Sequence, residues 1–412
     1  MTFGINISAA RPLDGLEKAF WLLDQHRPTH FVVTGEIRGM TTVKSWAGAM
    51  DETGRRLPQL ARRIVSRGGQ PAFVPVEPHG IPLHVVHGDC DSWTSHVEQE
   101  LHIPFDTAND SLVRARVLHE QDRAVLMLVL HHSVGDGASA VWLLRDVLRT
   151  LAGIPVVHAD DLRSLEQSVD DAGWEARVIP DLFTDGTRSP PGFRPATHSE
   201  SSVATQVLSR AASTTLRDRA RSEQATVHGA IAAAAARAHR SLSGLSDFPP
   251  RVFSPIDARR RLLGGAEHLG VHVNALTVRL DALSGSFWED ARQFSDAIGR
   301  FNSLDVLAGG IRAVREAVSP VKAPAEMAEG WAHVFGAEIL LTNLGVLDVP
   351  TSYGSLSLAS VWGPAVSTGI DSEQTLGALG FDGRLHLVHT SFQPVDRFLD
   401  EVVDTIKMAL SA

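Results

Sequence analysis

The chain lacks the features that define several classes of protein. It has 412 residues and a single cysteine, Cys90, so it cannot form an intramolecular disulfide. It has no basic segment followed by an apolar one near its N-terminus, and no apolar run of about 18 residues, as secretion or membrane insertion would require. We therefore expect a cytoplasmic protein.

Positive charge is also scarce. The 38 lysines and arginines are outnumbered by 48 aspartates and glutamates, which gives a net charge of −10. This balance disfavours nucleic acids and anionic membranes as main partners and favours small molecules. With 43% hydrophobic residues, the chain can bury sizeable cores in about two domains.

The most informative segment is residues 131–137, His-His-Ser-Val-Gly-Asp-Gly, which we call the histidine motif. It follows an apolar run, 124–130, that is short and partly β-branched and therefore predicts a buried strand. Gly135 and Gly137 permit a tight turn, and apolar residues then recur at helical spacing to Leu151. The pattern predicts a strand-turn-helix corner.

Neighbouring residues of a strand face opposite sides, so one of the two histidines can face a cavity while the other supports the backbone. A neutral imidazole can accept a proton from an alcohol, and we assign this general-base role to His132. The backbone N–H of Gly137, at the expected start of the helix, is a candidate donor to a developing oxyanion. A Ser-His-Asp triad that includes Asp136 is rejected, because no G-x-S-x-G sequence occurs.

Two other interpretations of the histidines are open. They could be satisfied core side chains beside a surface aspartate, or His132 and Asp136 could bind a metal, although no third ligand is obvious nearby. A second group of metal-binding residue types spans 84–96, but His84 and His87 would face opposite ways on a strand. We predict no metal site.

The motif H-H-x-x-x-D-G after an apolar strand resembles that of the condensation-domain and acyltransferase superfamily, which includes chloramphenicol acetyltransferase. Further similar segments occur in the expected order, at 104–106, 111–118, 254–259, 270–274 and 341–345. Within the superfamily the sequence is most similar to free-standing phthiocerol/phthiodiolone dimycocerosyl transferases and polyketide-tailoring O-acyltransferases. The D-F-G-W-G motif of the plant subgroup is absent.

The resemblance implies an α/β fold of two chloramphenicol-acetyltransferase-like subdomains with mixed sheets and an active-site tunnel between them. It implies a structural ion pair between Asp136 and Arg259, transfer without an acyl-enzyme, and no permanently bound cofactor. The donor would be acyl-CoA or a phosphopantetheinyl acyl carrier protein. Four more residues are substrate-binding candidates, although structural roles are at least as plausible for them: His131, Asn274, Thr342 and Asn343.

We therefore expect an O-acyltransferase of secondary metabolism that acts on a hydroxyl of a polyketide or a similar compound, as a monomer. An amide-forming condensation enzyme is an alternative, and a catalytically silent binding domain of the same fold is another. The acyl chain, the acceptor and the choice of donor are left open, because a tunnel is lined by residues that are far apart in sequence.

Turn-forming residues at 186–200 predict a linker between an N-terminal subdomain, 1–185, and a C-terminal subdomain, 201–412. Strands are predicted at 31–37, near 72–87, and at 124–130, 203–208, 251–256, 271–280, 338–342, 376–381 and 384–390. Helices are predicted at 41–52, 140–151, 213–224, from 227 with Thr226 as N-cap, and at 286–301, 308–318 and 395–410.

Overall fold

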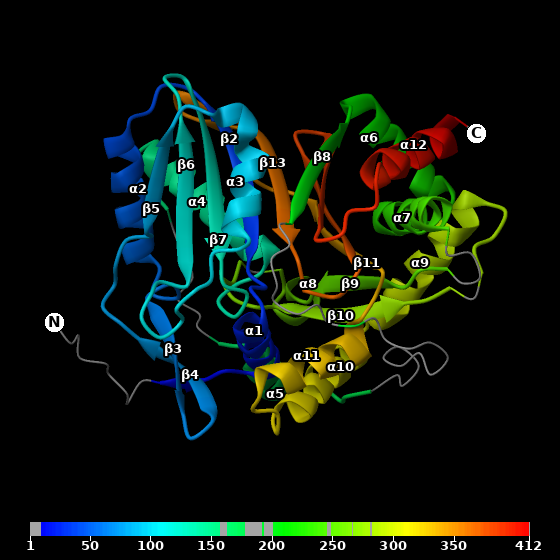
Figure 1. The fold of residues 1–412 in the computed structure, drawn as a ribbon, viewed down its shortest axis with the longest axis horizontal. Helices are drawn as coiled ribbons and strands as arrows, with labels where there is room; N and C mark the ends of the chain where they lie inside the picture. Colours follow the sequence, from blue (N-terminus) through cyan, green and yellow to red (C-terminus); the bar gives the residue numbers. More distant parts are fainter. Residues whose placement is uncertain are drawn as a thin grey trace.

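Two six-stranded mixed sheets lie side by side and carry helices on their faces (Figure 1). The computed structural model describes residues 10–156, 163–177, 192, 201–244, 249–265, 267–280 and 282–411. This mixed α/β architecture confirms the predicted fold class. The predicted linker at 186–200 lies outside the described residues except for Gly192.

The first sheet has the strand order β12-β13-β2-β7-β6-β5. Its strands are β2 (Phe31–Arg38), β5 (Leu83–His87), β6 (Val113–His119), β7 (Arg123–Leu130), β12 (Ser352–Tyr353) and β13 (Leu356–Val366). Helices α2 (Val43–Arg56) and α4 (Gly137–Leu151) cover one face, and α3 (Trp93–Glu100) follows the short η2 (Cys90–Ser92) on the other.

Strand β7 shows why its sequence is a continuous apolar run. Leu126 and Leu128 belong to the core beneath α2 and α4, whereas Val125 and Met127 pack against the α3 side. Because both faces of the strand are covered, no position along it can be polar without burying a polar group.

The second sheet has the strand order β10-β9-β11-β14-β15-β8. Its strands are β8 (Ser202–Leu208), β9 (Val252–Asp257), β10 (Val273–Val278), β11 (Ile339–Val346), β14 (Gln374–Phe381) and β15 (Arg384–Ser391). One face packs against α6 (Arg210–Ser222), α7 (Val227–Ser243), α9 (Phe287–Phe301) and α12 (Phe398–Ser411). The other side carries α1 (Gly15–His26), α5 (Leu165–Ala172), α8 (Arg259–Leu262), α10 (Leu304–Val318) and α11 (Pro324–Phe335).

The two sheets are joined by strands that follow β11. Strands β12 and β13 come from the predicted C-terminal subdomain, yet β13 pairs antiparallel with β2 in the first sheet. The chain then returns to the second sheet at β14. Residues of β13 such as Pro364 and Val366 thus lie at the junction of the sheets, where they line the cavity described below.

Several local predictions are confirmed by the structure. Thr226 caps α7 by accepting a hydrogen bond from the Gly229 N–H. The strands predicted at 376–381 and 384–390 are paired antiparallel, and the two residues between them, Asp382 and Gly383, both have positive φ, 47° and 72°. The sequence patterns did not predict α1, α11 or β13. A small sheet of order β1-β4-β3 completes the description, with strands β1 (Arg11–Pro12), β3 (Arg62–Arg67) and β4 (Gln70–Pro75).

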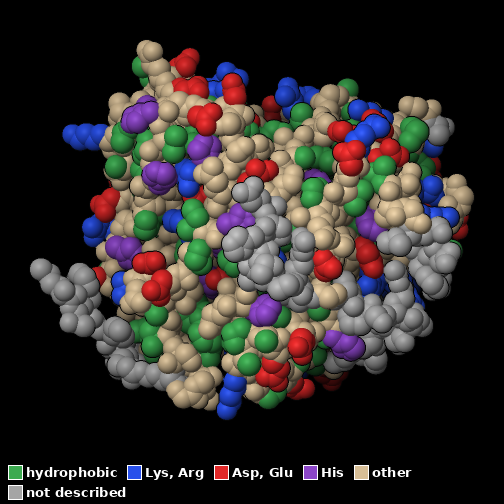
Figure 2. Space-filling model, in the orientation of Figure 1, with side chains coloured by type: hydrophobic (Ala, Val, Ile, Leu, Met, Phe, Trp, Pro, Cys, Tyr) green, Lys and Arg blue, Asp and Glu red, His purple; other side chains and the backbone are tan. Residues whose placement is uncertain are grey.

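Surface charge is mixed. Figure 2 shows acidic and basic side chains interspersed over the visible face. Among the described residues, no helix combines the length and the apolar character needed to cross a bilayer.

Candidate active site

The histidine motif forms the turn between β7 and α4. Strand β7 ends at Leu130 and α4 begins at Gly137, as the strand-turn-helix pattern predicts. Asp136 is the N-cap residue of α4: its Oδ1 accepts the Ser139 N–H at 3.0 Å. The helix start is therefore fixed by the motif itself.

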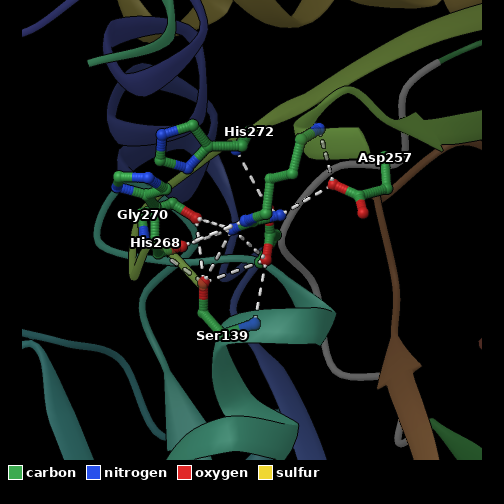
Figure 3. A network of polar contacts seen from close by, with 7 residues as sticks. Ser139, Asp257, His268, Gly270 and His272 are labelled. Atoms are coloured by element: carbon green, nitrogen blue, oxygen red, sulfur yellow. Dashed lines mark hydrogen bonds and ion pairs between the residues drawn. The ribbon is translucent and has the colours of Figure 1, made fainter. Parts of the chain in front are cut away.

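Asp136 and Arg259 form a buried ion pair with two hydrogen bonds, one from each terminal guanidinium nitrogen, at 2.8 and 3.0 Å (Figure 3). The His272 N–H also donates to Asp136, at 3.0 Å. Burial favours the protonated acid, but the charge and hydrogen bonds of Arg259 outweigh it and lower the pKa of Asp136 to about 2. The carboxylate is therefore ionised and fully engaged in holding the corner together.

Arg259 links this corner to the second sheet. Its guanidinium also donates to the carbonyl oxygens of His268 and Gly270, at 2.9 and 3.0 Å, and to Asp257 (Figure 3). Only 2% of Arg259 is exposed, so loss of one partner would leave a buried charge uncompensated.

His132 lies on the cavity side of the corner. Its ring stacks on Phe20 with a centroid distance of 3.9 Å and an interplanar angle of 16°, and Phe31 lies 4.8 Å away. The Nδ1 atom is buried and without a hydrogen-bond partner in the described structure. Burial lowers the pKa of His132 to about 4, although the Asp136 charge opposes the shift. The imidazole is therefore neutral at pH 7 and able to accept a proton.

His131 points away from the cavity. It is fully buried, its Nδ1 accepts the Ser133 N–H at 3.1 Å, and its Nε2 lies 3.5 Å from the Asp24 carboxylate. Because Nδ1 accepts, the proton of the neutral ring is on Nε2, facing Asp24. His131 thus fixes the backbone of the turn against α1.

Helix α1 contacts three consecutive residues of the motif. Its Glu17 carbonyl accepts the Ser133 hydroxyl at 2.8 Å, its Phe20 stacks on His132, and its Asp24 faces His131. Positions 17, 20 and 24 share one face of a helix, so this single element holds the whole turn. Sequence reasoning missed α1, and with it Phe20 and Asp24.

A cavity of about 130 Å³ opens beside His132, at the junction of the two sheets. Its walls come from both sheets and from α1, α4 and α11, and are mainly apolar. The lining includes Leu16, Phe20, Leu23, Phe31, Phe253, Val273, Ala275, Trp331, Leu340, Leu344, Pro364 and Val366. A predominantly apolar hollow with a few convergent polar groups is typical of a small-molecule site.

Three further predicted residues line this cavity: Gly137, Thr342 and Asn343. A Cβ atom on Gly137 would lie 2.7 Å from both the Leu344 Cδ2 and the Pro364 Cγ atoms, so glycine lets the helix start meet the cavity wall. The Asn343 side chain accepts the Gly345 N–H at 2.9 Å, which ties it to its own strand.

The structure places the other two substrate-binding candidates outside the lining of this cavity. His131 faces Asp24, because strand alternation turns it away from His132. Asn274 donates to the Leu307 carbonyl at 3.1 Å, as a buried amide must find an internal partner. Both side chains serve the protein framework.

Thr368 and Glu373 belong to the site and carried no sequence signal. Thr368 lines the cavity, and its hydroxyl donates to the Glu373 carboxylate at 2.9 Å. Glu373 also accepts the Thr375 hydroxyl at 3.1 Å, and only 6% of it is exposed. Burial raises the pKa of Glu373 to about 7, although these hydrogen bonds oppose the shift.

The described residues contain no group of three or more histidine, cysteine or acidic side chains placed to hold a metal ion. Cys90 is fully buried within its subdomain core. Burial, followed by repulsion from Glu120, raises the pKa of its thiol to about 12, so it is not an activated nucleophile.

Solved structures define the class of fold. The first condensation domain of the calcium-dependent antibiotic synthetase matches 98% of this chain over 97% of its own, with 15% identity and a TM-score of 0.72. The match to the trichothecene 15-O-acetyltransferase from Fusarium sporotrichioides covers 97% of this chain and 95% of that protein, with 13% identity and a TM-score of 0.70. The match to polyketide synthase associated protein 5 from Mycobacterium tuberculosis covers 98% of this chain and 99% of that protein, with 15% identity and a TM-score of 0.65.

The chain thus has the two-subdomain fold of condensation domains and their acyltransferase relatives. Residues 198–270 match the family described as phthiocerol/phthiodiolone dimycocerosyl transferase C-terminus. Together these findings confirm the resemblance to the superfamily.

Similarity to a curated protein is narrower. Malpinin synthetase from Mortierella alpina is 25% identical over an alignment of 182 residues, and the alignment covers 41% of this chain. The chain spans about 2% of the length of that relative.

Proposed function

We propose that the protein is an O-acyltransferase that moves an acyl group from a CoA or carrier-protein thioester to a hydroxyl of a polyketide or other secondary metabolite. The observation that carries the proposal is a neutral imidazole, His132, on the wall of an apolar cavity, with its Nδ1 unpartnered among the described residues. The superfamily fold supports acyl transfer or condensation, and the proteins of similar structure include an O-acetyltransferase.

In the proposed reaction His132 is the general base. Because Nδ1 is buried, Nε2 is the atom that would take the acceptor's hydroxyl proton as the oxygen attacks the thioester carbonyl. The tetrahedral intermediate then collapses, the carbon–sulfur bond breaks, and the imidazolium returns its proton to the leaving thiolate. The acyl group passes directly to the acceptor, so no enzyme nucleophile and no resident cofactor are needed.

Two other parts of the site would assist this reaction. The Gly137 N–H, at the positive end of the α4 dipole, would stabilise the negative oxygen of the intermediate. Asp136 and Arg259 would act as positioning residues, because their charged groups bind each other and the backbone around the turn. The apolar lining fits an acyl chain or another apolar part of the substrate.

The test is product detection by mass spectrometry, with acyl-CoA and acyl carrier protein donors and pooled hydroxyl and amine acceptors. His132→Ala should lower the rate by about 100-fold or more, the scale of a general base. His333→Ala, at an exposed position of α11, is the matched control and should react like the wild type. Circular dichroism would show that both variants are folded.

Each outcome has a meaning for the proposal. Wild-type rates in folded His132→Ala would refute the base assignment. Product from amine acceptors alone would favour the condensation enzyme, and no turnover with any donor would favour the silent binding domain.

A further inference from the structure

The small sheet β1-β4-β3 places two arginines on the same face. Arg11 of β1 is directly opposite Phe73 of β4, and Phe73 is opposite Ile64 of β3. Arg62 lies two residues before Ile64 and so shares its side of the strand. Both guanidinium groups lie over the Phe73 ring, 5.1 Å away for Arg11 and 5.5 Å for Arg62.

These arginines line a second cavity, of about 20 Å³, together with Arg163. The histidine motif forms part of its wall through Ser133 and Val134, which directly follow His132. This second cavity, which we call the arginine cavity, therefore lies beside the candidate active site. A third cavity shares Val271 with the arginine cavity, and it shares Leu16 and Trp331 with the cavity at His132.

Among the described residues, the arginine cavity offers Arg62 no acidic partner of its own. Glu17 is the acidic residue among the described lining, and both of its oxygens bind Arg11, at 2.9 and 2.7 Å. Arg62 is half-buried, and its side chain makes no hydrogen bond or ion pair with a described residue. Burial, followed by repulsion from Arg11, lowers the pKa of Arg62 to about 10. A partly desolvated cation without a counter-ion is costly, so an external anion would relieve it.

A neutral donor also borders the arginine cavity. His272 is 2% exposed, and both of its ring nitrogens are buried without a hydrogen-bond partner in the described structure. A buried imidazole carries one N–H even when neutral, and that N–H needs an acceptor. His272 and Arg62 thus both lack an acceptor at the same cavity.

We propose that the arginine cavity binds a phosphate-class oxoanion, with Arg62 as its main ligand. A guanidinium fork matches two phosphate oxygens, and Phe73 holds the fork in place. The anion is either free inorganic phosphate or the phosphate of the donor's phosphopantetheine arm, whose thioester would reach His132. The second source rests on the proposed function, whereas the site itself does not.

The first experiment measures binding of inorganic phosphate by calorimetry and thermal denaturation at constant ionic strength, with chloride as the reference salt. Phosphate should stabilise the wild type, and Arg62→Met should weaken its binding about 10- to 100-fold, as expected for lost hydrogen bonds to a charged group. Arg63→Met is the matched control: residue 63 faces the other side of β3, near Asp106, and should leave binding unchanged.

The same variants can overturn the proposal without an activity assay. It fails if the wild type shows no effect of phosphate beyond that of chloride, or if Arg62→Met binds phosphate as tightly as the wild type.

The second experiment identifies the source of the anion. Turnover of an acyl-phosphopantetheine is compared with that of the acyl-pantetheine that lacks the phosphate. A donor-phosphate site predicts a KM about 10-fold or more lower for the phosphorylated donor, a preference that Arg62→Met abolishes with kcat unchanged. Equal KM values beside clear phosphate binding would assign the site to free phosphate. If no donor is turned over, the proposed function fails, while the phosphate titration still decides the site.

Discussion

Two buried carboxylates, Asp136 in the cavity wall and Glu373 behind the cavity-lining Thr368, differ in charge at neutral pH. Asp136 is 3% exposed and Glu373 is 6% exposed, so the two pay similar desolvation costs. Asp136 meets the guanidinium of Arg259, and its pKa falls to about 2. Glu373 accepts hydrogen bonds from two threonine hydroxyls and the Thr368 N–H, all uncharged donors, and its pKa rises to about 7. A positive partner, and not the degree of burial, decides which of them is charged at neutral pH.

The difference also sets opposite responses to pH. For Asp136 the unfolded state binds more protons between pH 3.8 and about 2, so stability is lost as the pH falls through that window. For Glu373 the folded state binds more protons between pH 4.5 and about 7, so stability is lost as the pH rises through that window. The Asp136–Arg259 ion pair therefore stabilises the fold at neutral pH, whereas the contacts of Glu373 with the threonines stabilise it at acidic pH.

The largest expected effect comes from breaking the ion pair. Asp136→Ala should lower the free energy of unfolding by about 3 to 5 kcal/mol, because Arg259 stays buried and loses its one buried counter-charge, with the half-exposed Asp257 as its remaining acidic partner. Urea denaturation at pH 7 measures the change. The double variant Asp136→Ala/Arg259→Met should recover part of the loss, since it leaves no buried charge. A single variant that costs less than about 1 kcal/mol would contradict the importance given to this pair.

A smaller effect is expected for Glu373→Gln, which should abolish a pH dependence of the free energy of unfolding. The raised pKa, from 4.5 to about 7, corresponds to about 3 kcal/mol of stability lost between those pH values. Glu373→Gln should remove this slope and be more stable than the wild type at pH 8. Denaturation curves from pH 4 to 8 test this, with Glu329→Gln at an exposed position of α11 as the control. A slope that persists in Glu373→Gln would place the titrating group elsewhere.

The smallest effect concerns His132, which resembles Glu373 because its pKa shift comes mainly from burial. Its pKa of about 4 predicts that kcat/KM stays level from pH 7 down to about pH 5 and falls near pH 4. Phe20→Leu should expose the imidazole and move this acidic limb to higher pH, with a modest change in stability. A limb at pH 6.5 in the wild type would mean that His132 is not desolvated during turnover.

The sequence predicted the half of the site that is built from local pattern. An apolar run covered on both faces, two glycines and a capping aspartate fix the corner between β7 and α4, and these are properties of neighbouring residues. The contact between Asp136 and Arg259 spans 123 positions and was available through the family resemblance alone. Spacing and periodicity hold no information about such a distant pair.

The other half of the site depends on elements that were not predicted. Helix α1 brings Phe20 and Asp24 to the two histidines, α11 brings Trp331, and β13 brings Pro364 across from the second half of the chain. Glu373 is an unremarkable acid in the sequence, and its raised pKa arises from the absence of a nearby cation in a buried setting. Strand alternation predicted that one histidine would point away from the cavity, but it did not predict that this side chain would lie beside the Asp24 carboxylate.

The sequence by itself determined the strand-turn-helix corner and the candidate base, because these follow from residue types at short spacings. The class of fold was available through the family resemblance. The tertiary structure alone decided which side chains surround that base, which buried acid is charged, and that Arg62 lies beside the motif without an ion-pair partner among the described residues. Burial and pairing are properties of side chains that meet only after folding, so their electrostatic consequences cannot be inferred from the order of residues.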